Sequence, residues 1–406
     1  MRIAILTNSY PPDSRGGSGQ IAKLQADWFI SKGHEVRVWV PAPFSDVPNN
    51  EPIKTFKTQT SIPFPEIAKH NPLSRLFFHI EDLSPNASLV EEIRSYNPDV
   101  LLTHNLTGCG WGTPDTLRKA GIRWVHVLHD VQMIEPSGQI FSKESLPALR
   151  SIWRKYWAKK RSKTFGSPDT IITPSNWLLT FHKQFNLFQN SKTTVVPNPI
   201  LKPNPNRAQL DEPLTGIELS STNHEFKIVL YVGRVSKDKG VENLIEAWSL
   251  FKQKIDVRPS SRAHVEGSSK FDVRLRLVGD GPYLQEIKKL NDPTIECLGA
   301  LDHSELAKYY AEASIFVFPS LLMENQPTVL LEAVSHGLNI VASDIGGVGE
   351  LLRGYGTLVP PADSAKLADA INTEITNKPN LALGQEILSR HDMDKVMDEY
   401  LKNLSL

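Results

Sequence analysis

The chain has 406 residues, which is long enough for two or three domains that each bury a core of their own. Lysine plus arginine and aspartate plus glutamate number 45 each, so no overall charge favours nucleic acid or an acidic substrate. Two cysteines give no disulfide framework, and no apolar run approaches the ~18 residues of a membrane span. We therefore expect a soluble, cytoplasmic protein that at most rests on the inner face of a membrane.

In the first half of the chain, short β-branched runs alternate with helical patterns. Residues 18–31 place Ile21, Leu24 and Trp28 at helical spacing, and Gly33 ends that helix. The repeated β-α-β order predicts a parallel sheet with helices on both faces. The strands expected in this half are 2–6, 35–40, 100–103, 124–128, 170–173 and 193–196.

Residues 201–225 interrupt this alternation with three prolines and a Ser-Ser-Thr-Asn cluster, and we interpret them as a linker. The alternation then resumes, apart from a polar stretch at 256–272 that predicts a surface insertion. The chain thus reads as α/β, with two doubly wound domains facing each other across a cleft, and ligands are expected beyond the carboxyl ends of the strands. The strands expected in the second half are 227–232, 273–278, 294–298, 315–318 and 339–343, with helices at 241–254 and 304–313.

The loop after the first strand contains Gly16 and Gly17 and opens a helix. Its glycines and the free N–H groups of the helix start suit a phosphate or an oxyanion. The dinucleotide-binding pattern G-x-G-x-x-G is broken because Ala22 stands at its third glycine, and the esterase pattern G-x-S-x-G is broken because Gln20 stands at its last glycine. The chain also has no phosphate-binding loop ending in Gly-Lys-Ser/Thr. On this loop alone, a flexible turn remains an alternative.

Two further loops carry charge in the second half. Gly233 and Arg234 follow the strand 227–232, and Lys239 adds a second cation beside the next helix, as a diphosphate leaving group requires. Glu324 and Glu332 follow the strand 315–318, with Pro327 suited to the first helical turn between them. If each loop is considered by itself, the first can also be a solvated basic turn, and the two glutamates of the second can form surface salt bridges.

Together these segments resemble the retaining glycosyltransferase family 4, also called glycosyl transferases group 1. The resemblance rests on the E-x7-E pair, Gly233-Arg234 with Lys239-Gly240, the Gly-Asp-Gly segment at 279–281 and the Pro-Asn-Pro segment at 197–199. It implies the GT-B fold of two Rossmann-like domains, with the C-terminal helix crossing back to the N-terminal domain. The implied domains are an acceptor-binding one of residues 1–200 plus 388–406, the linker 201–225, and a nucleotide-sugar-binding one of residues 226–387.

The resemblance also implies roles for single residues. His129 matches a histidine near the reacting sugar, Arg234 and Lys239 match the pair that neutralises the diphosphate, and Glu324 matches an acid on the sugar hydroxyls. Glu332 is expected to hydrogen-bond the ribose. The remaining donor-binding residues implied are Gly16, Gly17, Gly233, Leu298 beside the base, and the amides of Thr328 and Val329.

The implied activity is transfer of a hexose-type sugar from a UDP- or GDP-linked donor to a glycan or lipid-linked acceptor in cell-surface polysaccharide or glycolipid synthesis. No cofactor and no metal is expected, and the Asp392-Met-Asp394 sequence is interpreted as a helix start. Pro327 departs from the family pattern and removes one backbone donor near the sugar. A nucleotide-sugar epimerase and a non-catalytic nucleotide-sugar-binding module are the alternatives.

Residues 149–165 hold seven basic side chains and no acid, with a helical stripe of Leu149, Ile152, Trp153, Tyr156 and Trp157. One hypothesis is an amphipathic surface for anionic lipid headgroups. The alternative is an ordinary helix that buries its tryptophans and leaves a solvated basic face.

Overall fold

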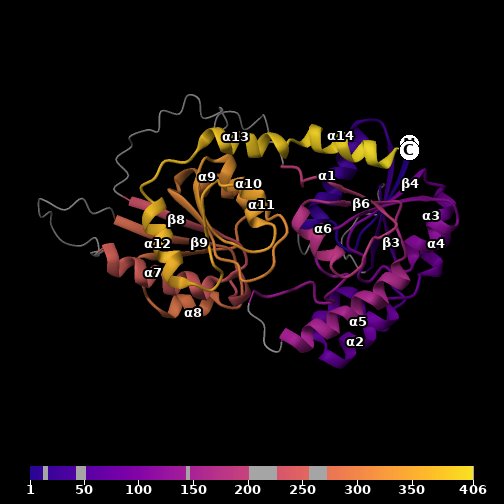
Figure 1. Ribbon diagram of the computed structural model, residues 1–406, viewed down its shortest axis with the longest axis horizontal. Helices are drawn as coiled ribbons and strands as arrows, with labels where there is room; N and C mark the ends of the chain where they lie inside the picture. Colours follow the sequence, from indigo (N-terminus) through magenta and orange to yellow (C-terminus); the bar gives the residue numbers. More distant parts are fainter. Residues whose placement is uncertain (12–16, 43–51, 143–146, 201–225, 256–271, 406) are drawn as a thin grey trace, which may run out of the picture. The chain divides into compact units, whose positions relative to one another are not determined.

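A computed structural model describes residues 1–11, 17–42, 52–142, 147–200, 226–255 and 272–405. The expected linker 201–225, the insertion up to residue 271, and Gly16 lie outside the described residues. The chain forms two compact units, each built on one parallel sheet (Figure 1). The N-terminal unit comprises Met1–Ile140, Glu144–Pro199 and Asp394–Leu406, and the C-terminal unit comprises Phe141–Lys143 and Ile200–Met393.

The N-terminal unit has a seven-stranded sheet in the order β3-β2-β1-β4-β5-β6-β7. Its central strands β1, β4 and β6 are almost fully buried, because helices cover both faces of a parallel sheet. This explains their continuous apolar runs in the sequence. The strands are β1 (Arg2–Leu6), β2 (Glu35–Pro41), β3 (Ile53–Phe56), β4 (Val100–Thr103), β5 (Arg123–Val127), β6 (Thr170–Thr173) and β7 (Lys192–Val195).

Several helices of this unit begin at a side chain that caps them. Asn71, Asn86 and Ser175 each accept a hydrogen bond from an N–H of the first turn, which satisfies a donor that the helix itself leaves unpaired. The helices are α1 (Gly17–Ser31), the 3-10 helix η1 (Phe64–Lys69), α2 (Pro72–Glu81), α3 (Ala87–Tyr96), α4 (Thr113–Lys119), α5 (Pro147–Phe165), α6 (Asn176–Lys183) and α14 (Met393–Leu404).

The last helix, α14, packs on the N-terminal unit although the preceding residues belong to the other one. The Trp28 indole N–H donates to Asp394 Oδ1 at 3.0 Å, and the Thr194 hydroxyl donates to Asn403 Oδ1 at 3.2 Å. The expectation that the C-terminal helix returns to the first domain is therefore confirmed.

The C-terminal unit has a six-stranded sheet in the order β10-β9-β8-β11-β12-β13. Alternate residues of β8 enter separate apolar clusters: Val229 and Tyr231 on one face, Leu230 and Val232 on the other. Helices therefore cover both faces, as in a doubly wound domain. The strands are β8 (Phe226–Val232), β9 (Asp272–Val278), β10 (Ile295–Gly299), β11 (Ile315–Phe318), β12 (Asn339–Ser343) and β13 (Thr357–Val359).

The helices between these strands include the expected one at 304–313, where the Glu305 carboxylate accepts from the Asp302 N–H at 3.3 Å. Among the described helices, none is long and apolar enough to cross a bilayer. The helices are η3 (Lys237–Lys239), α7 (Val241–Ile255), α8 (Leu284–Lys289), α9 (His303–Glu312), α10 (Thr328–Ser335), α11 (Val348–Leu352), α12 (Ser364–Glu374) and α13 (Leu381–Arg390).

The α/β class and the parallel sheets are confirmed, whereas β3 and β13 were not predicted. Both are short edge strands of four and three residues, so each pairs on one side only. Such strands lack the long buried apolar run that marks a central strand. Asp272, assigned to the insertion from the sequence, instead opens β9.

Candidate active site

The charged loops of the C-terminal unit meet at the carboxyl edge of its sheet. β8 pairs with β9 on one side and with β11 on the other. The chain adds β9 and β10 on one side of β8 and then crosses to add β11 on the other, so the strand order reverses at β8. Gly233 and Arg234 directly follow β8, and Glu324 lies in the loop after β11. A doubly wound sheet binds ligands at such a reversal.

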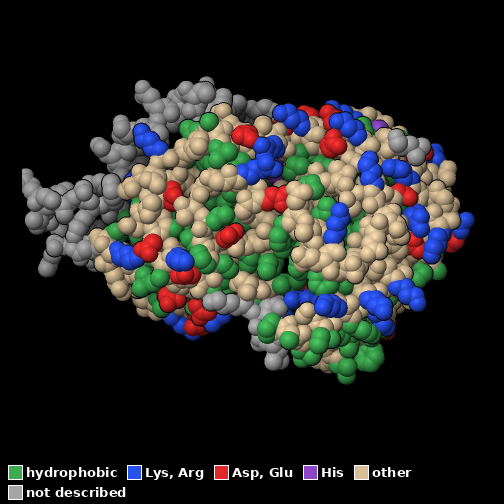
Figure 2. Space-filling model, in the orientation of Figure 1, with side chains coloured by type: hydrophobic (Ala, Val, Ile, Leu, Met, Phe, Trp, Pro, Cys, Tyr) green, Lys and Arg blue, Asp and Glu red, His purple; other side chains and the backbone are tan. Residues whose placement is uncertain are grey.

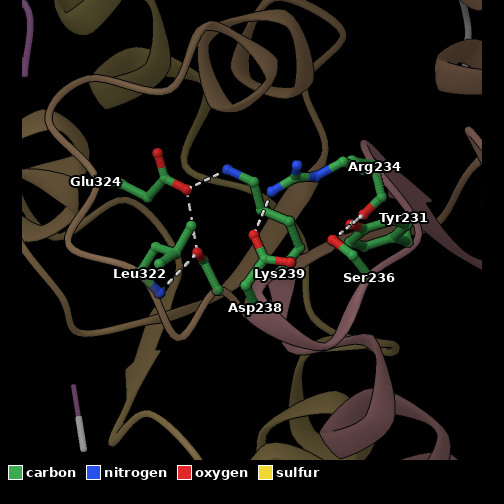
Figure 3. Close-up of polar contacts among 8 residues, drawn as sticks. Tyr231, Arg234, Ser236, Asp238, Lys239, Leu322 and Glu324 are labelled. Carbon is green, nitrogen blue, oxygen red and sulfur yellow. Dashed lines mark hydrogen bonds and ion pairs between the residues drawn. The ribbon is translucent and has the colours of Figure 1, made fainter. Parts of the chain in front are cut away.

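Lys239 and Glu324 form a direct ion pair there, with Nζ 2.5 Å from Oε1 (Figure 3). The Ser320 hydroxyl donates to the same oxygen at 3.1 Å, and the Leu322 N–H donates to the Ser320 hydroxyl at 3.3 Å. The side chains of Lys239 and Glu324 are 27% and 19% exposed. The second carboxylate oxygen of Glu324 points away from these contacts in Figure 3. The pair is thus fixed in position and still reachable from solvent.

Arg234 stands beside this pair on the loop that follows β8. Its guanidinium is paired with the Asp238 carboxylate, and its side chain is about half exposed. The Tyr231 hydroxyl donates to the Arg234 carbonyl at 2.7 Å, which anchors the backbone from a buried side chain. The structure therefore brings Arg234, Lys239 and Glu324 together, as the sequence analysis expected, and adds Asp238 as a second acid.

Glycines allow these loops to pack closely. A Cβ on Gly346 would lie 2.0 Å from the Glu324 carbonyl oxygen, and one on Gly240 would lie 1.8 Å from the Pro319 carbonyl oxygen. Both residues have left-handed backbones, with φ of 63° and 73°. The Gly347 N–H also donates to the Glu324 carbonyl at 2.8 Å. The position of Glu324 thus depends on a contact that only glycine permits at residue 346.

Glu332 is held on α10 by a different partner. Its Oε2 accepts from the hydroxyl of the buried Tyr310 at 3.0 Å. Thr328 and Val329 are the first two residues of α10, where backbone N–H groups have no partner within the helix. Pro327, predicted in the first helical turn, instead precedes the helix as its cap. Its extended backbone, with ψ of 119°, explains why the helix starts one residue later.

Leu298 and Gly299 end β10, two strands away from β8. The Gly279 N–H donates to the Gly299 carbonyl at 2.7 Å, and a Cβ on Gly279 would lie 1.9 Å from the Gly233 carbonyl oxygen. Gly233 and Gly299 are therefore joined through Gly279. A Cβ on Gly299 itself would meet nothing within 4 Å.

In the N-terminal unit, His129 follows β5 and lies against His104, which follows β4. His104 Nδ1 and His129 Nε2 are 2.7 Å apart, and the two rings are stacked with centroids 5.0 Å apart. Burial lowers the pKa of His129 to about 4, and burial together with the neighbouring histidines holds the pKa of His104 well below its usual range. Both rings are therefore neutral at pH 7.

Asp130 connects the neighbouring loops of the same sheet edge. It accepts from the Asn105 amide at 2.9 Å and from the Gln132 N–H at 2.8 Å, and burial raises its pKa to about 6. The Asn105 amide also lies 3.4 Å from the hydroxyl of Ser18, next to the exposed Gly17 at the start of α1. Gly17 and His129 are thus linked through a short polar network.

The sequence analysis missed several partners of the predicted residues. Asp238 and Ser320 hold Arg234 and Glu324, while His104 contacts His129. His104 directly follows the predicted strand 100–103, so a search for polar residues at strand ends would have found it. Asp238 and Ser320 each stand four residues from their partner, but that spacing is too common to single them out.

The Asp392-Met-Asp394 sequence has a structural use at the start of α14. Asp394 accepts from the Trp28 indole and lies 3.8 Å from the Lys32 ammonium. Within the described ranges, no group of three or more His, Cys, Asp or Glu side chains is placed to hold a metal ion.

Comparison with known families matches both units. Residues 15–200 match the family described as Glycosyltransferase Family 4, and residues 226–377 match the family described as Glycosyl transferases group 1. The two matches together cover most of the chain.

Two distant relatives span nearly the whole length of the chain. An "Uncharacterized 42.6 kDa protein in cps region" from Klebsiella pneumoniae is 23% identical, over 87% of this chain and 88% of its own. The Bacillus subtilis (strain 168) protein named "Putative teichuronic acid biosynthesis glycosyltransferase TuaC" is 24% identical, over 91% and 88%. Among solved structures, Anabaena Alr3699/HepE in complex with UDP superposes with a TM-score of 0.67 at 19% identity, over 100% of both chains. The chain therefore belongs to glycosyltransferase family 4 and has the GT-B architecture.

Proposed function

We propose that this glycosyltransferase moves a hexose-type sugar from a UDP- or GDP-linked donor, with retention of anomeric configuration, to a glycan or lipid-linked acceptor in cell-surface polysaccharide or glycolipid synthesis. The observation that carries the proposal is the Lys239–Glu324 ion pair with Arg234 beside it. Two accessible cations suit a diphosphate, and an acid beside them suits the sugar attached to it.

Each group of the cluster has a proposed role in binding the donor. Lys239 and Arg234 meet the diphosphate, and the amides of Thr328 and Val329 add donors from the start of α10. Glu324 accepts from a sugar hydroxyl through the oxygen that Lys239 and Ser320 leave open. Glu332 accepts from the ribose, and Leu298 lies beside the base. The UDP in the similar Anabaena structure supports a nucleotide donor.

In the proposed reaction, the acceptor hydroxyl attacks the anomeric carbon from the face that the diphosphate leaves. The bond from that carbon to the phosphate oxygen breaks, the bond to the acceptor oxygen forms, and the acceptor proton moves to the departing diphosphate. Lys239 and Arg234 stabilise the charge that builds on the leaving group. Preorganised cations can supply this stabilisation without a metal, so we propose that none is required.

The acceptor assignment draws on the names of the relatives. One is a protein of a cps region, and another is named for teichuronic acid biosynthesis. Both names associate this branch of the family with bacterial surface polymers. Neither specifies a linkage, so the proposal is limited to a glycan or lipid-linked acceptor.

A panel of UDP-, GDP- and ADP-sugars tests the proposal in two steps. Specific binding raises the melting temperature by mass action, so the correct donor will stand out in a thermal-shift screen. That donor is then incubated with candidate glycan and glycolipid acceptors, and the anomeric configuration of the product is read by NMR. A retained configuration is expected. An inverted product would contradict retention, and an epimerised donor in the absence of acceptor would favour an epimerase.

A further inference from the structure

Two helices of the N-terminal unit expose large apolar side chains next to each other. Six of the eleven large hydrophobic residues that are exposed in the described chain lie on α2 and α5. The two helices are in contact, since the His79 ring of α2 packs against the Trp157 ring of α5 at 6.1 Å. We call these six side chains the α2–α5 surface: Leu73, Phe77 and Ile80 on α2, and Leu149, Ile152 and Tyr156 on α5.

These side chains do not belong to the core that the helices form. On each helix the three residues fall within one face at spacings of three or four, and they are between 42% and 66% exposed. The opposite face of α5 buries Arg154, Trp157 and Arg161. Arg154 is paired with Glu135 at 3.2 Å, and the Arg161 guanidinium lies 4.2 Å from the Trp111 ring centre. The helix thus buries two arginines while it leaves three large apolar residues in water.

The seven basic side chains of residues 149–165 do not all lie on one solvated face. Two of them, Arg154 and Arg161, are buried in the core. The other five are exposed beside the apolar residues, and none has an acidic partner among the described residues: Arg150, Lys155, Lys159, Lys160 and Lys163. The helix itself contains no acid. Figure 2 shows apolar side chains gathered at this edge of the unit with lysine and arginine around them.

We propose that the α2–α5 surface docks on an anionic lipid bilayer. Its apolar side chains enter the boundary between headgroups and acyl chains, and the exposed cations of α5 contact anionic headgroups. The equal numbers of acidic and basic residues in the chain make this unpaired positive charge a local feature. A second copy of the chain is a poorer occupant, because a two-fold contact through this face would bring two sets of cations together.

Co-sedimentation of the full chain with vesicles tests the proposal. One set contains phosphatidylcholine alone, and in the other about a third of the lipid is phosphatidylglycerol. We expect binding to the anionic set only, with a loss between about 0.1 M and about 0.5 M salt as screening grows. Equal binding to both sets, or to neither, would overturn the proposal.

Variants at exposed positions separate the two parts of the surface. Lys159→Gln with Lys160→Gln should lower the partition coefficient roughly 30-fold, and Phe77→Ser with Ile152→Ser should also release the protein. The matched controls are Lys366→Gln and Leu290→Ser, which change an exposed lysine and an exposed leucine of the C-terminal unit. Unchanged melting temperatures will show that all variants are folded. The proposal is wrong if the control variants lose vesicle binding to the same extent. It is also wrong if the unaltered protein binds no vesicles and analytical ultracentrifugation shows a dimer that Phe77→Ser with Ile152→Ser abolishes.

Discussion

The cluster around Lys239 and the cluster around His129 each lie at the carboxyl edge of the sheet of their own unit, but one contains charged side chains and the other contains neutral histidines. In the C-terminal unit, Lys239 and Glu324 are paired and partly exposed. In the N-terminal unit, burial lowers the pKa of both His104 and His129. This difference fits our proposal, in which the Lys239 cluster presents charge to the donor and the His129 cluster offers neutral hydrogen-bonding groups.

The same contrast extends to the surroundings of the two clusters. Six histidines of the described chain have a lowered pKa, and all six lie in the N-terminal unit: His34, His79, His104, His126, His129 and His182. For five of them the histidine is largely buried, so desolvation of the charged form is the main cause. Protonation of these histidines at low pH should therefore lower the free energy of unfolding of the N-terminal unit.

The largest expected effect is on the charged cluster, in Lys239→Ala. A cation about 4 Å from the leaving group contributes at most about 4 kcal/mol at an effective dielectric near 20, so turnover should fall by up to about a thousandfold. Steady-state release of nucleoside diphosphate measures it. Lys237→Ala is the matched control, because Lys237 lies two residues away, exposed and paired with Glu242 at 2.9 Å. Equal losses in the two variants would contradict a specific role for Lys239.

The next effect concerns the neutral cluster, in a comparison of the protein with His129→Asn. The folded-state pKa of His129 is about 4 against an ordinary 6.5, so the unfolded chain binds the extra proton first as the pH falls. The contribution of His129 is complete above pH 6.5 and is lost towards pH 4. Between pH 7 and 5 the protein should lose about 2 kcal/mol relative to the variant.

Urea unfolding followed by tryptophan fluorescence checks this result, because seven of the eight tryptophans lie in the N-terminal unit. Burial raises the pKa of Asp82 to about 7 and that of Asp130 to about 6. Protonation of these two carboxyls therefore stabilises the folded protein as the pH falls. These carboxyls are common to the protein and the variant, so the comparison reports His129 together with its effect on the pKa of His104. Parallel pH profiles would show that His129 is not held neutral.

A comparison of two glycine substitutions tests the packing that positions Glu324. Gly346→Ala and Gly354→Ala both place a side chain at positive φ, 63° and 90°, but only the first meets backbone atoms. The clash should lower the free energy of unfolding by about 1 to 3 kcal/mol more in Gly346→Ala, and it should reduce turnover as well. Calorimetry and initial rates measure both. Indistinguishable variants would mean that the loop accommodates a methyl group.

The smallest expected effect is that of Glu332→Gln on nucleotide affinity. A hydrogen bond to a charged acceptor exceeds a neutral one by about 1 kcal/mol, so the dissociation constant should rise roughly fivefold with kcat nearly unchanged. Glu324→Gln should do the reverse and lower kcat more than affinity. Titration calorimetry and kinetics distinguish the two acids. If Glu332→Gln instead lowers kcat and Glu324→Gln instead weakens nucleotide binding, the proposed roles are reversed.

The sequence predicted the central strands well, because each is a short apolar run between turn residues. It also predicted the group of Arg234, Lys239 and Glu324, since parallel strands bring their carboxyl ends to one edge. It failed where burial reverses ordinary residue preferences. Arg154 and Arg161 were expected in solvent, but ion pairing with Glu135 and stacking on Trp111 let them enter the core. His104 was missed although it directly follows a predicted strand, because polar residues at strand ends were not searched systematically.

Titration calorimetry with a nucleoside diphosphate and with the nucleoside alone tests the central claim most directly. The pair used is UDP or GDP, whichever stabilises the protein, with its own nucleoside. We predict that Lys239→Ala weakens diphosphate binding by about a hundredfold and leaves nucleoside binding unchanged. The account is contradicted if the protein binds diphosphate and nucleoside with equal affinity, or if Lys239→Ala binds the diphosphate as tightly as the unaltered chain.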